Sequence, residues 1–336
     1  MVAIENFQKL FANSHYEEDL EIAIQLNRRL LKPIGMWPVN SKSPKEKFIA
    51  NLLRIGCIMI ILFLFEICVC FEIMSNDWRS VSSKNREIML KSANTARKII
   101  ILCAIFMFTG SLSFTVFFPL LDNYFASENA TVRNTGCCSL TCGICSVTIS
   151  FVMHISGQLE IVNGFLQLLV KETSSTLQVT EKMISLIVKQ HLKSLRFAEH
   201  LENIMNEICL IEFLSSSFGI CLIGYYILWE FKNNDITKMV VYCILLTSYI
   251  FNIFIYCFLS ELLLTKCQDV GKQSYMIPEW NYLPKKKSLD LILIILISSK
   301  PVKLTAGKIV SFSIGCFCSV LKVSAAYLNI LRSFLN

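Results

Sequence analysis

Apolar residues occur along this chain in long continuous blocks rather than at the spacing of an amphipathic helix or strand. A bilayer core takes about 20 consecutive apolar residues in an α-helix. Six blocks meet this requirement and alternate with polar stretches. The predicted membrane spans are residues 53–74, 99–121, 137–159, 209–229, 239–264 and 305–331.

A seventh apolar run, residues 289–298, is too short to cross a bilayer. We expect an amphipathic or re-entrant helix there, at the inner membrane face, that leads into the last span. Charged residues make up 17% of the chain, against about 25% in soluble domains. The sequence therefore predicts an all-α polytopic membrane protein, a helical bundle with six evident spans.

Lysine and arginine are concentrated in alternate loops, and cytoplasmic loops carry the excess of positive charge. Loops 75–98, 165–206 and 266–308 hold six, five and eight basic residues, whereas 122–136 and 230–238 hold one and two. The first three are therefore predicted inside and the C-terminus outside. The glycosylation sequon at Asn129 falls in a loop predicted outside, which agrees.

The N-terminal segment, residues 1–50, conflicts with a simple count of crossings. It carries seven basic residues and no secretory signal, so it is also predicted to be cytoplasmic. One span cannot separate two segments that lie on the same side. Either the first apolar segment forms a hairpin, or a span expected after Met74 is absent.

Several function classes are excluded by the same pattern. The net charge of +7 lies in membrane loops and does not indicate nucleic acid. Cys137, Cys138, Cys142 and Cys145, with His154, lie in an apolar span without a second thiolate pair, so packing is expected rather than a metal site. No catalytic constellation or phosphate loop is present, so neither an enzyme nor a cofactor is expected. The inverted topology and the lack of an Asp-Arg-Tyr triplet argue against coupling to a G protein.

Five segments carry a resemblance to a known family. Residues 27–38 read NRRLLKPIGMWP, and residues 191–198 read HLKSLRFA, followed by Glu202. Residues 260–284 and the sequences LTAGK and AYLNILR at the two ends of the last span complete the pattern. Together they resemble insect odorant receptors, most closely the hymenopteran expansions of that family.

The resemblance implies a seven-span channel gated by a small volatile organic ligand. Its N-terminus is inside, and it forms a heterotetramer with an odorant co-receptor in the plasma membrane of olfactory neuron dendrites. Such a channel conducts cations without selectivity, and its partners are the co-receptor, the odorant and membrane lipid. This chain departs from the family between Met74 and Asn76, where the second span is missing. A skipped exon, a mis-joined gene or a decaying copy would explain the gap.

Two alternatives stay open beside the odorant-gated channel. One is a non-conducting or non-functional truncated receptor, and the other is a gustatory receptor of the same superfamily. The expected organisation is a cytoplasmic segment (1–50), a membrane bundle with ligand pocket and cytoplasmic helical extensions (51–264), a cytoplasmic anchor segment (265–304) and a pore-lining helix (305–336).

The last span carries small residues at intervals of four, Gly307, Ser311, Gly315 and Ser319, which permit close helix packing within or between subunits. The resemblance places the pore constriction at Ile330, Ser333 and Phe334. Lys322 lies at membrane depth close to the same helix face, where it faces either the pore or a neighbouring subunit.

The resemblance also implies a ligand pocket in the outer half of the bundle, lined by apolar and aromatic groups with few polar ones. Each candidate serves equally in helix packing. The candidate ligand-binding residues are Phe114, Phe117, Phe118, Ser146, Thr148, Tyr242, Thr247 and Ser248.

Overall fold

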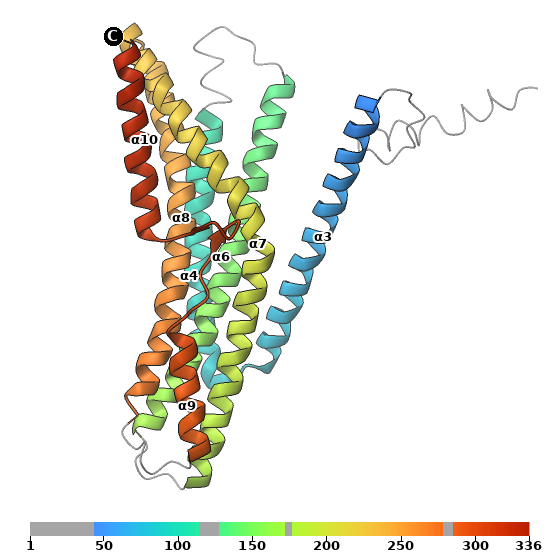
Figure 1. The fold of residues 1–336 in the computed structure, drawn as a ribbon, viewed down its shortest axis with the longest axis vertical. Coiled ribbons are helices and arrows are strands. Elements are labelled where there is room, and N and C mark those ends of the chain that lie inside the picture. The colour runs from blue at the N-terminus through green and yellow to red at the C-terminus, as the bar shows by residue number, and fades with distance from the viewer. Residues whose placement is uncertain (1–43, 114–127, 172–176, 278–284, 336) are drawn as a thin grey trace, which may run out of the picture. The chain divides into compact units, whose positions relative to one another are not determined.

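The computed structural model describes residues 44–113, 128–171, 177–277 and 285–335, and these are almost entirely helical (Figure 1). The described residues fall into two units, which divide between Phe71 and Glu72. In chain order the elements are α3 (Pro44–Ser80), α4 (Ser83–Leu112), α6 (Glu128–Lys171), α7 (Leu177–Asn233), α8 (Ile236–Tyr275), α9 (Lys285–Ser298), β1 (Thr305–Ala306), β2 (Val310–Ser311) and α10 (Ile314–Leu335).

The first unit contributes most of α3, and its side chains are apolar and exposed. Ile60, Ile61 and Phe65 are 60%, 57% and 63% exposed. Large apolar groups on every side of a helix are typical of a membrane span, because lipid rather than water surrounds them. This agrees with the span predicted at residues 53–74.

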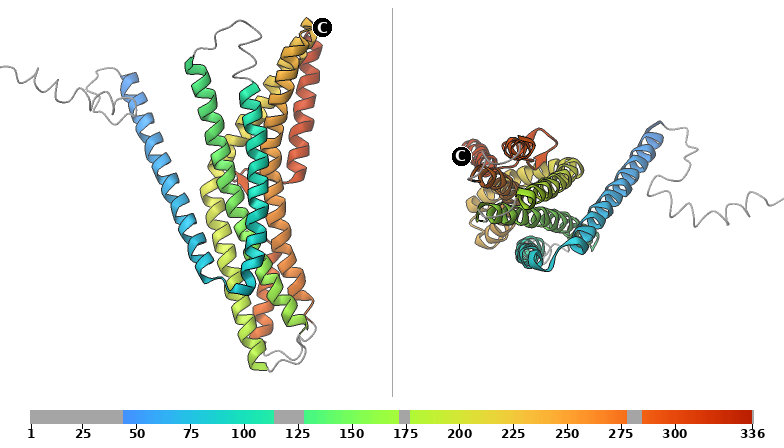
Figure 2. Two further views of the ribbon diagram at one scale, coloured as in Figure 1. Left: turned by 180° about the vertical axis from the view of Figure 1, so that it is seen from behind. Right: turned by 90° about the horizontal axis from the view of Figure 1, so that it is seen from below.

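The second unit is a bundle built on α4, α6, α7 and α8 (Figure 2). Helix α4 packs against α6 and α8, and α7 packs against α6, α8 and the two shorter helices, α9 and α10. Large side chains from α6, α7 and α8 form the core of the bundle. The most deeply buried of them include Ile149, Phe151, Ile155, Ile184, Leu201 and Tyr256.

Among the described residues, six helices are long and apolar enough to cross a membrane, which confirms the predicted number of evident spans. Helix α7 has 57 residues and rises about 1.5 Å per residue, so it is much longer than a bilayer core of about 30 Å. The segment predicted as a loop at 165–206 is therefore mostly helical extension of α6 and α7. Helix α9 has 14 residues and is too short to span, as predicted.

Helix α3 continues through Met74 and Asn76 without a break. Val81 and Ser82 alone separate α3 from α4. The missing second span and the side on which each end lies stay predictions. The N-terminal signature at 27–38 lies outside the described residues.

Polar side chains join the last turns of α3 to the bundle at one end. Asp77 is 4% exposed and forms an ion pair with Lys193 of α7. His154 Nε2 of α6 lies 3.1 Å from the other Asp77 carboxylate oxygen. A buried carboxylate requires such partners, because burial removes its water. The contacts fix the positions of residues 72–80, α6 and α7 relative to one another.

The prediction of one continuous helix at residues 305–331 is wrong at its beginning. Thr305–Ala306 and Val310–Ser311 form an antiparallel hairpin, and α10 begins only at Ile314. Gly307 and Lys308 adopt left-handed backbone angles, with φ of 60° and 58°, which no α-helix contains. Ser313 then caps α10, since its Oγ accepts a hydrogen bond from the Cys316 amide at 3.0 Å.

This hairpin also corrects the predicted stripe of small residues. Gly307 lies in the hairpin turn and Ser311 in β2, so neither shares a helix face with Gly315 and Ser319. Gly307 instead contacts α7: a Cβ atom there would lie 2.7 Å from Leu210 Cδ2. Gly315 and Ser319 are on α10 and exposed, and their role in packing stays a prediction.

Candidate functional site

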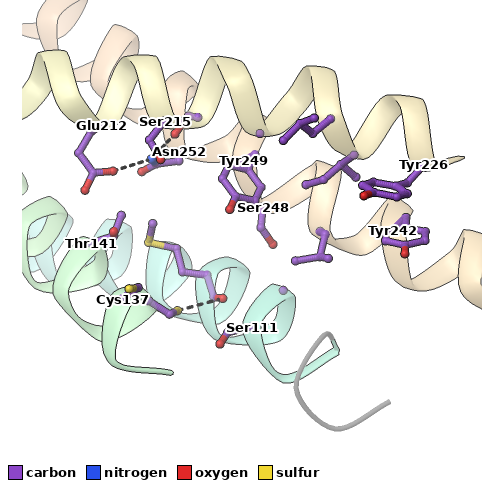
Figure 3. Close-up of a pocket in the computed structure, with 18 residues that line it drawn as sticks. Ser111, Cys137, Thr141, Glu212, Ser215, Tyr226, Tyr242, Ser248, Tyr249 and Asn252 are labelled. Carbon is purple, nitrogen blue, oxygen red and sulfur yellow. Dashed lines mark hydrogen bonds between the residues drawn. The ribbon is translucent and has the colours of Figure 1, made fainter. Parts of the chain in front are cut away.

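A cavity of about 660 Å³ lies between α4, α6, α7 and α8 (Figure 3). Its lining includes residues near the end of α4, near the beginning of α6, near the end of α7 and near the beginning of α8. The cavity therefore lies toward the end of the bundle where α4 leads to α6 and α7 leads to α8. Its lining is largely apolar or aromatic, with a few hydroxyls and one carboxylate. The lining residues are Met107, Gly110, Ser111, Cys137, Cys138, Thr141, Glu212, Ser215, Ser216, Gly219, Leu222, Ile223, Tyr226, Tyr242, Leu245, Ser248, Tyr249 and Asn252.

Aromatic rings form one part of the cavity wall. Tyr226 of α7 and Tyr242 of α8 stack with their ring centroids 5.5 Å apart and an interplanar angle of 14°. Tyr249 lies against Gly219, where a Cβ atom would come within 2.7 Å of the ring. The absence of a side chain at Gly219 therefore lets this ring lie close to α7.

Helices α4 and α8 approach closely beside the cavity. Ser248 Oγ donates a hydrogen bond to the Phe106 carbonyl at 2.7 Å, and Phe106 stacks on Phe251 at 4.3 Å. A side chain at Gly110 would collide with Ser248. These contacts fix the cavity wall formed by α4 and α8.

Polar groups gather at a second part of the wall, formed by α7 and α8. Asn252 is 4% exposed, and its Nδ2 donates to Glu212 Oε2 at 3.2 Å and to Ser216 Oγ at 2.8 Å. Thr141 of α6 also bonds to the Glu212 carboxylate. Figure 3 shows Glu212 and Thr141 facing each other from α7 and α6.

The structure brings two of the predicted ligand-binding residues into this cavity, Tyr242 and Ser248. Ser146, Thr148 and Thr247 do not line it. Their hydroxyls donate to carbonyls four residues earlier in their own helices. Sequence spacing alone did not show which helix face turned inward. Phe114, Phe117 and Phe118 lie outside the described residues.

Sequence reasoning missed Glu212 and Asn252. A signal was present, because both lie inside predicted spans and a polar or charged residue at membrane depth faces a cavity or a partner. Thr141, Cys137 and Cys138 were also not assigned to a pocket. They line it from α6, and Cys138 Sγ donates to the Met107 carbonyl of α4 at 3.3 Å.

Helix α10 places the predicted pore residues on its outer side. Its inner side carries Ser324, 5% exposed, and Leu328, which packs where Gly224 of α7 has no side chain. Lys322, Ile330 and Ser333 are exposed and point away from the bundle. The structure does not describe the side chains of Phe334 and Asn129. The assignment of α10 residues to a pore stays a prediction.

Residues 123–325 match the protein family described as "7tm Odorant receptor". This chain belongs to the odorant receptor family. The receptor is 26% identical to odorant receptor 13a of Drosophila melanogaster over 212 residues, which cover 57% of this chain and 50% of that relative. It is 24% identical to odorant receptor 10 of Aedes albopictus over 245 residues, covering 68% and 63%. The matched part thus spans about half the length of such relatives.

The fold of this odorant receptor is similar to that of the insect olfactory receptor OR5 from Machilis hrabei. A structure of OR5 in complex with eugenol superposes with a TM-score of 0.56 at 15% identity, covering 91% of this chain and 98% of OR5. A second OR5 structure gives a TM-score of 0.52 at 13% identity, covering 87% and 82%. At this identity the likeness shows the fold alone.

Together the comparisons and the helices establish an insect odorant receptor with several membrane-spanning helices. Its relatives are receptors rather than enzymes, as the sequence predicted. The hymenopteran character stays a prediction.

Proposed function

We propose that this odorant receptor binds a small volatile organic molecule in the cavity between α4, α6, α7 and α8. The observation that carries the proposal is the cavity itself, about 660 Å³ and walled by tyrosines and aliphatic groups. Ligand pockets in proteins typically measure about 300–1,000 Å³ and have mostly apolar walls with few polar groups. OR5, which shares the fold, has been solved with eugenol, a small aromatic molecule.

The proposal includes channel activity through α10. Lys322 and Ser333 share the side of α10 that points away from the bundle, since 11 residues place them about 20° apart around the helix. A charged group at membrane depth faces water or a partner. In a heterotetramer with the co-receptor, this side of α10 would line a cation pathway in the plasma membrane. A ligand opens it only by binding the open state more tightly than the closed one.

Ligand binding is tested with a substitution, Ser215→Phe, that fills the cavity and leaves the rest of α7 unchanged. Ser215 lines the cavity, whereas its neighbour Leu214 is 57% exposed and does not line it. The receptor and the co-receptor are co-expressed in oocytes, and a panel of volatiles is screened for evoked current. Ser215→Phe is expected to abolish the responses of the wild-type receptor, and Leu214→Phe is the matched control that retains them.

Three outcomes would count against parts of the proposal. Unchanged responses in Ser215→Phe would exclude this cavity as the odorant site. Odorant-evoked current from this chain without the co-receptor would exclude the obligate heteromer. Ligand binding without any current in the co-expressed complex would favour a non-conducting subunit instead.

A further inference from the structure

The cavity contains one carboxyl group, that of Glu212, and no cationic side chain among the described residues that line it. An ionised carboxylate in an apolar bundle is costly unless a cation or several hydrogen bonds stabilise it. The partners found for Glu212, Asn252 and Thr141, are neutral. A carboxylate oriented toward a cavity without a counter-charge indicates a cationic ligand.

The hydrogen bonds around Glu212 leave acceptor capacity unused. A carboxylate offers about four lone-pair positions, and Asn252 and Thr141 together supply two donors. Both hydrogens of the Asn252 amide are engaged, by Glu212 and Ser216, and its Oδ1 has no partner among the described residues. The Asn252 amide nitrogen faces Glu212, which is the orientation in which an ionised carboxylate accepts its hydrogen bond. Asn252 therefore orients the carboxylate and adds a further partial negative charge beside it.

The rest of the cavity is suited to an apolar body. The stacked rings of Tyr226 and Tyr242 line it away from Glu212 (Figure 3), and Leu222 and Leu245 also belong to its lining. Aromatic faces also attract a cation, which adds to the charge preference. One cavity thus combines a carboxylate with apolar walls.

We propose that this receptor selects amines, with the protonated amino group bound by Glu212 and an aromatic or aliphatic body held between α7 and α8. The inference rests on the proposed function and adds the chemical class of the ligand. An ammonium group carries a positive charge and only donors, so it satisfies the acceptors that Glu212 leaves free. Esters, ketones and aldehydes offer acceptors only and gain nothing there.

The test compares two probes of equal size that differ in one group, 2-phenylethylamine and 2-phenylethanol. Their binding to the purified receptor–co-receptor complex is measured by isothermal titration at neutral pH. A charge-assisted contact predicts that the amine binds about 10- to 100-fold more tightly than the alcohol. Glu212→Gln keeps the size and removes the charge, so it is expected to lower amine affinity by that factor while alcohol affinity is retained.

Glu207→Gln is the matched control. Glu207 lies on the same helix, is exposed and does not line the cavity, so its substitution is expected to leave both affinities unchanged. Retained binding of 2-phenylethanol by Glu212→Gln shows that this variant is folded.

The amine proposal is overturned if the wild-type complex binds the alcohol as tightly as the amine, a result that requires no variant. It is also overturned if Glu212→Gln keeps the amine preference. In either case, if Ser215→Phe abolishes binding of 2-phenylethanol, the cavity is still supported as the odorant site. If Ser215→Phe alters the binding of neither probe, the cavity and the amine proposal fail together.

Discussion

Glu202 of α7 accepts two hydrogen bonds from Thr305, one from its backbone amide at 3.0 Å and one from its hydroxyl. The two residues are 103 positions apart. The Gly307 amide also donates to the Asn206 carbonyl at 2.8 Å, and Lys308 Nζ donates to Asn203 Oδ1 at 3.1 Å. These contacts fasten the β1–β2 hairpin to α7 and so determine where α10 begins.

Loss of the Glu202 carboxylate should destabilise the receptor. Glu202→Ala leaves the Thr305 amide and hydroxyl without their acceptor, which costs about 2 kcal/mol for a buried charged hydrogen bond. We expect a lower midpoint of thermal unfolding in detergent. Glu199→Ala, at an exposed position on the same helix, should leave the midpoint unchanged. Equal midpoints for the two variants would show that the hairpin contact adds no stability.

Replacement by alanine should lower the unfolding midpoint at Gly307 but leave it unchanged at Gly315. Gly307 has φ of 60°, and a Cβ atom there would lie 2.7 Å from Leu210. A left-handed conformation costs a non-glycine residue about 1–2 kcal/mol, before any collision. Gly307→Ala should therefore lower the unfolding midpoint and surface expression.

Gly315→Ala is the control for that change, because the nearest atom to its Cβ would be Ser313 Oγ at 3.6 Å, an ordinary contact. The monomer should tolerate it. A stability loss in Gly315→Ala as large as that in Gly307→Ala would show instead that α10 packs there against another subunit.

Loss of Lys193 should destabilise the receptor at least as much as loss of Asp77, because it leaves a buried carboxylate without its cation. The Asp77 side chain is 5% exposed and that of Lys193 46% exposed, so Lys193 regains water when its partner is removed. Asp77→Ala also removes the neighbour of His154 and is expected to cost about 1–3 kcal/mol. Lys193→Ala leaves a buried carboxylate with His154 alone.

A double-mutant cycle on Asp77 and Lys193 measures their coupling through unfolding midpoints. The two losses should add to more than the loss in the double variant, because both remove one ion pair. Lys189→Ala, at an exposed position on α7, is the control and should combine additively with Asp77→Ala. Strict additivity of Asp77→Ala and Lys193→Ala would contradict the ion pair.

Ile330 is predicted to help form an apolar constriction near the end of α10. Its side chain is 54% exposed in the single chain, which leaves it available to a pore. A serine in a narrow apolar neck lets water enter. Ile330→Ser should raise leak current without odorant or change cation permeability ratios, and only partially, since the co-receptor supplies the other subunits.

Leu331→Ser is the control, because Leu331 points about 100° away around the helix. Unchanged leak and selectivity in Ile330→Ser, with surface expression and odorant response retained, would exclude a pore-lining role. If Leu331→Ser changes them instead, the assigned register is wrong by one residue.

Asn129 is predicted to lie outside the cell, and residues 266–308 inside. Glycan should be attached to Asn129 and disappear in Asn129→Gln, as seen by a mobility shift after glycosidase treatment. Protease added to intact cells should leave the 266–308 segment uncut. Cleavage there from outside would reverse the proposed orientation of every loop.

The cavity shows why site residues were only partly predictable. Tyr242 and Ser248 were predicted because they lie in the outer half of an apolar span that is rich in aromatic residues. Thr247, one residue earlier than Ser248, turns about 100° away and bonds within its own helix. In a helix that is apolar on all sides, the sequence carries no periodicity that marks the inward face. Only packing against α4, α6 and α7 selected it.

The sequence alone determined the class of protein and the places of its long helices, because a bilayer demands about 20 apolar residues in each crossing and that demand is local. Tertiary structure decided the rest. The hairpin at Thr305–Ser311 replaces a predicted helical turn because Glu202, distant in sequence, supplies the acceptor that holds it. Glu212 and Asn252 become one polar site only because α7 and α8 lie side by side. Hydropathy reports the environment of a segment, whereas contacts between segments depend on which faces meet.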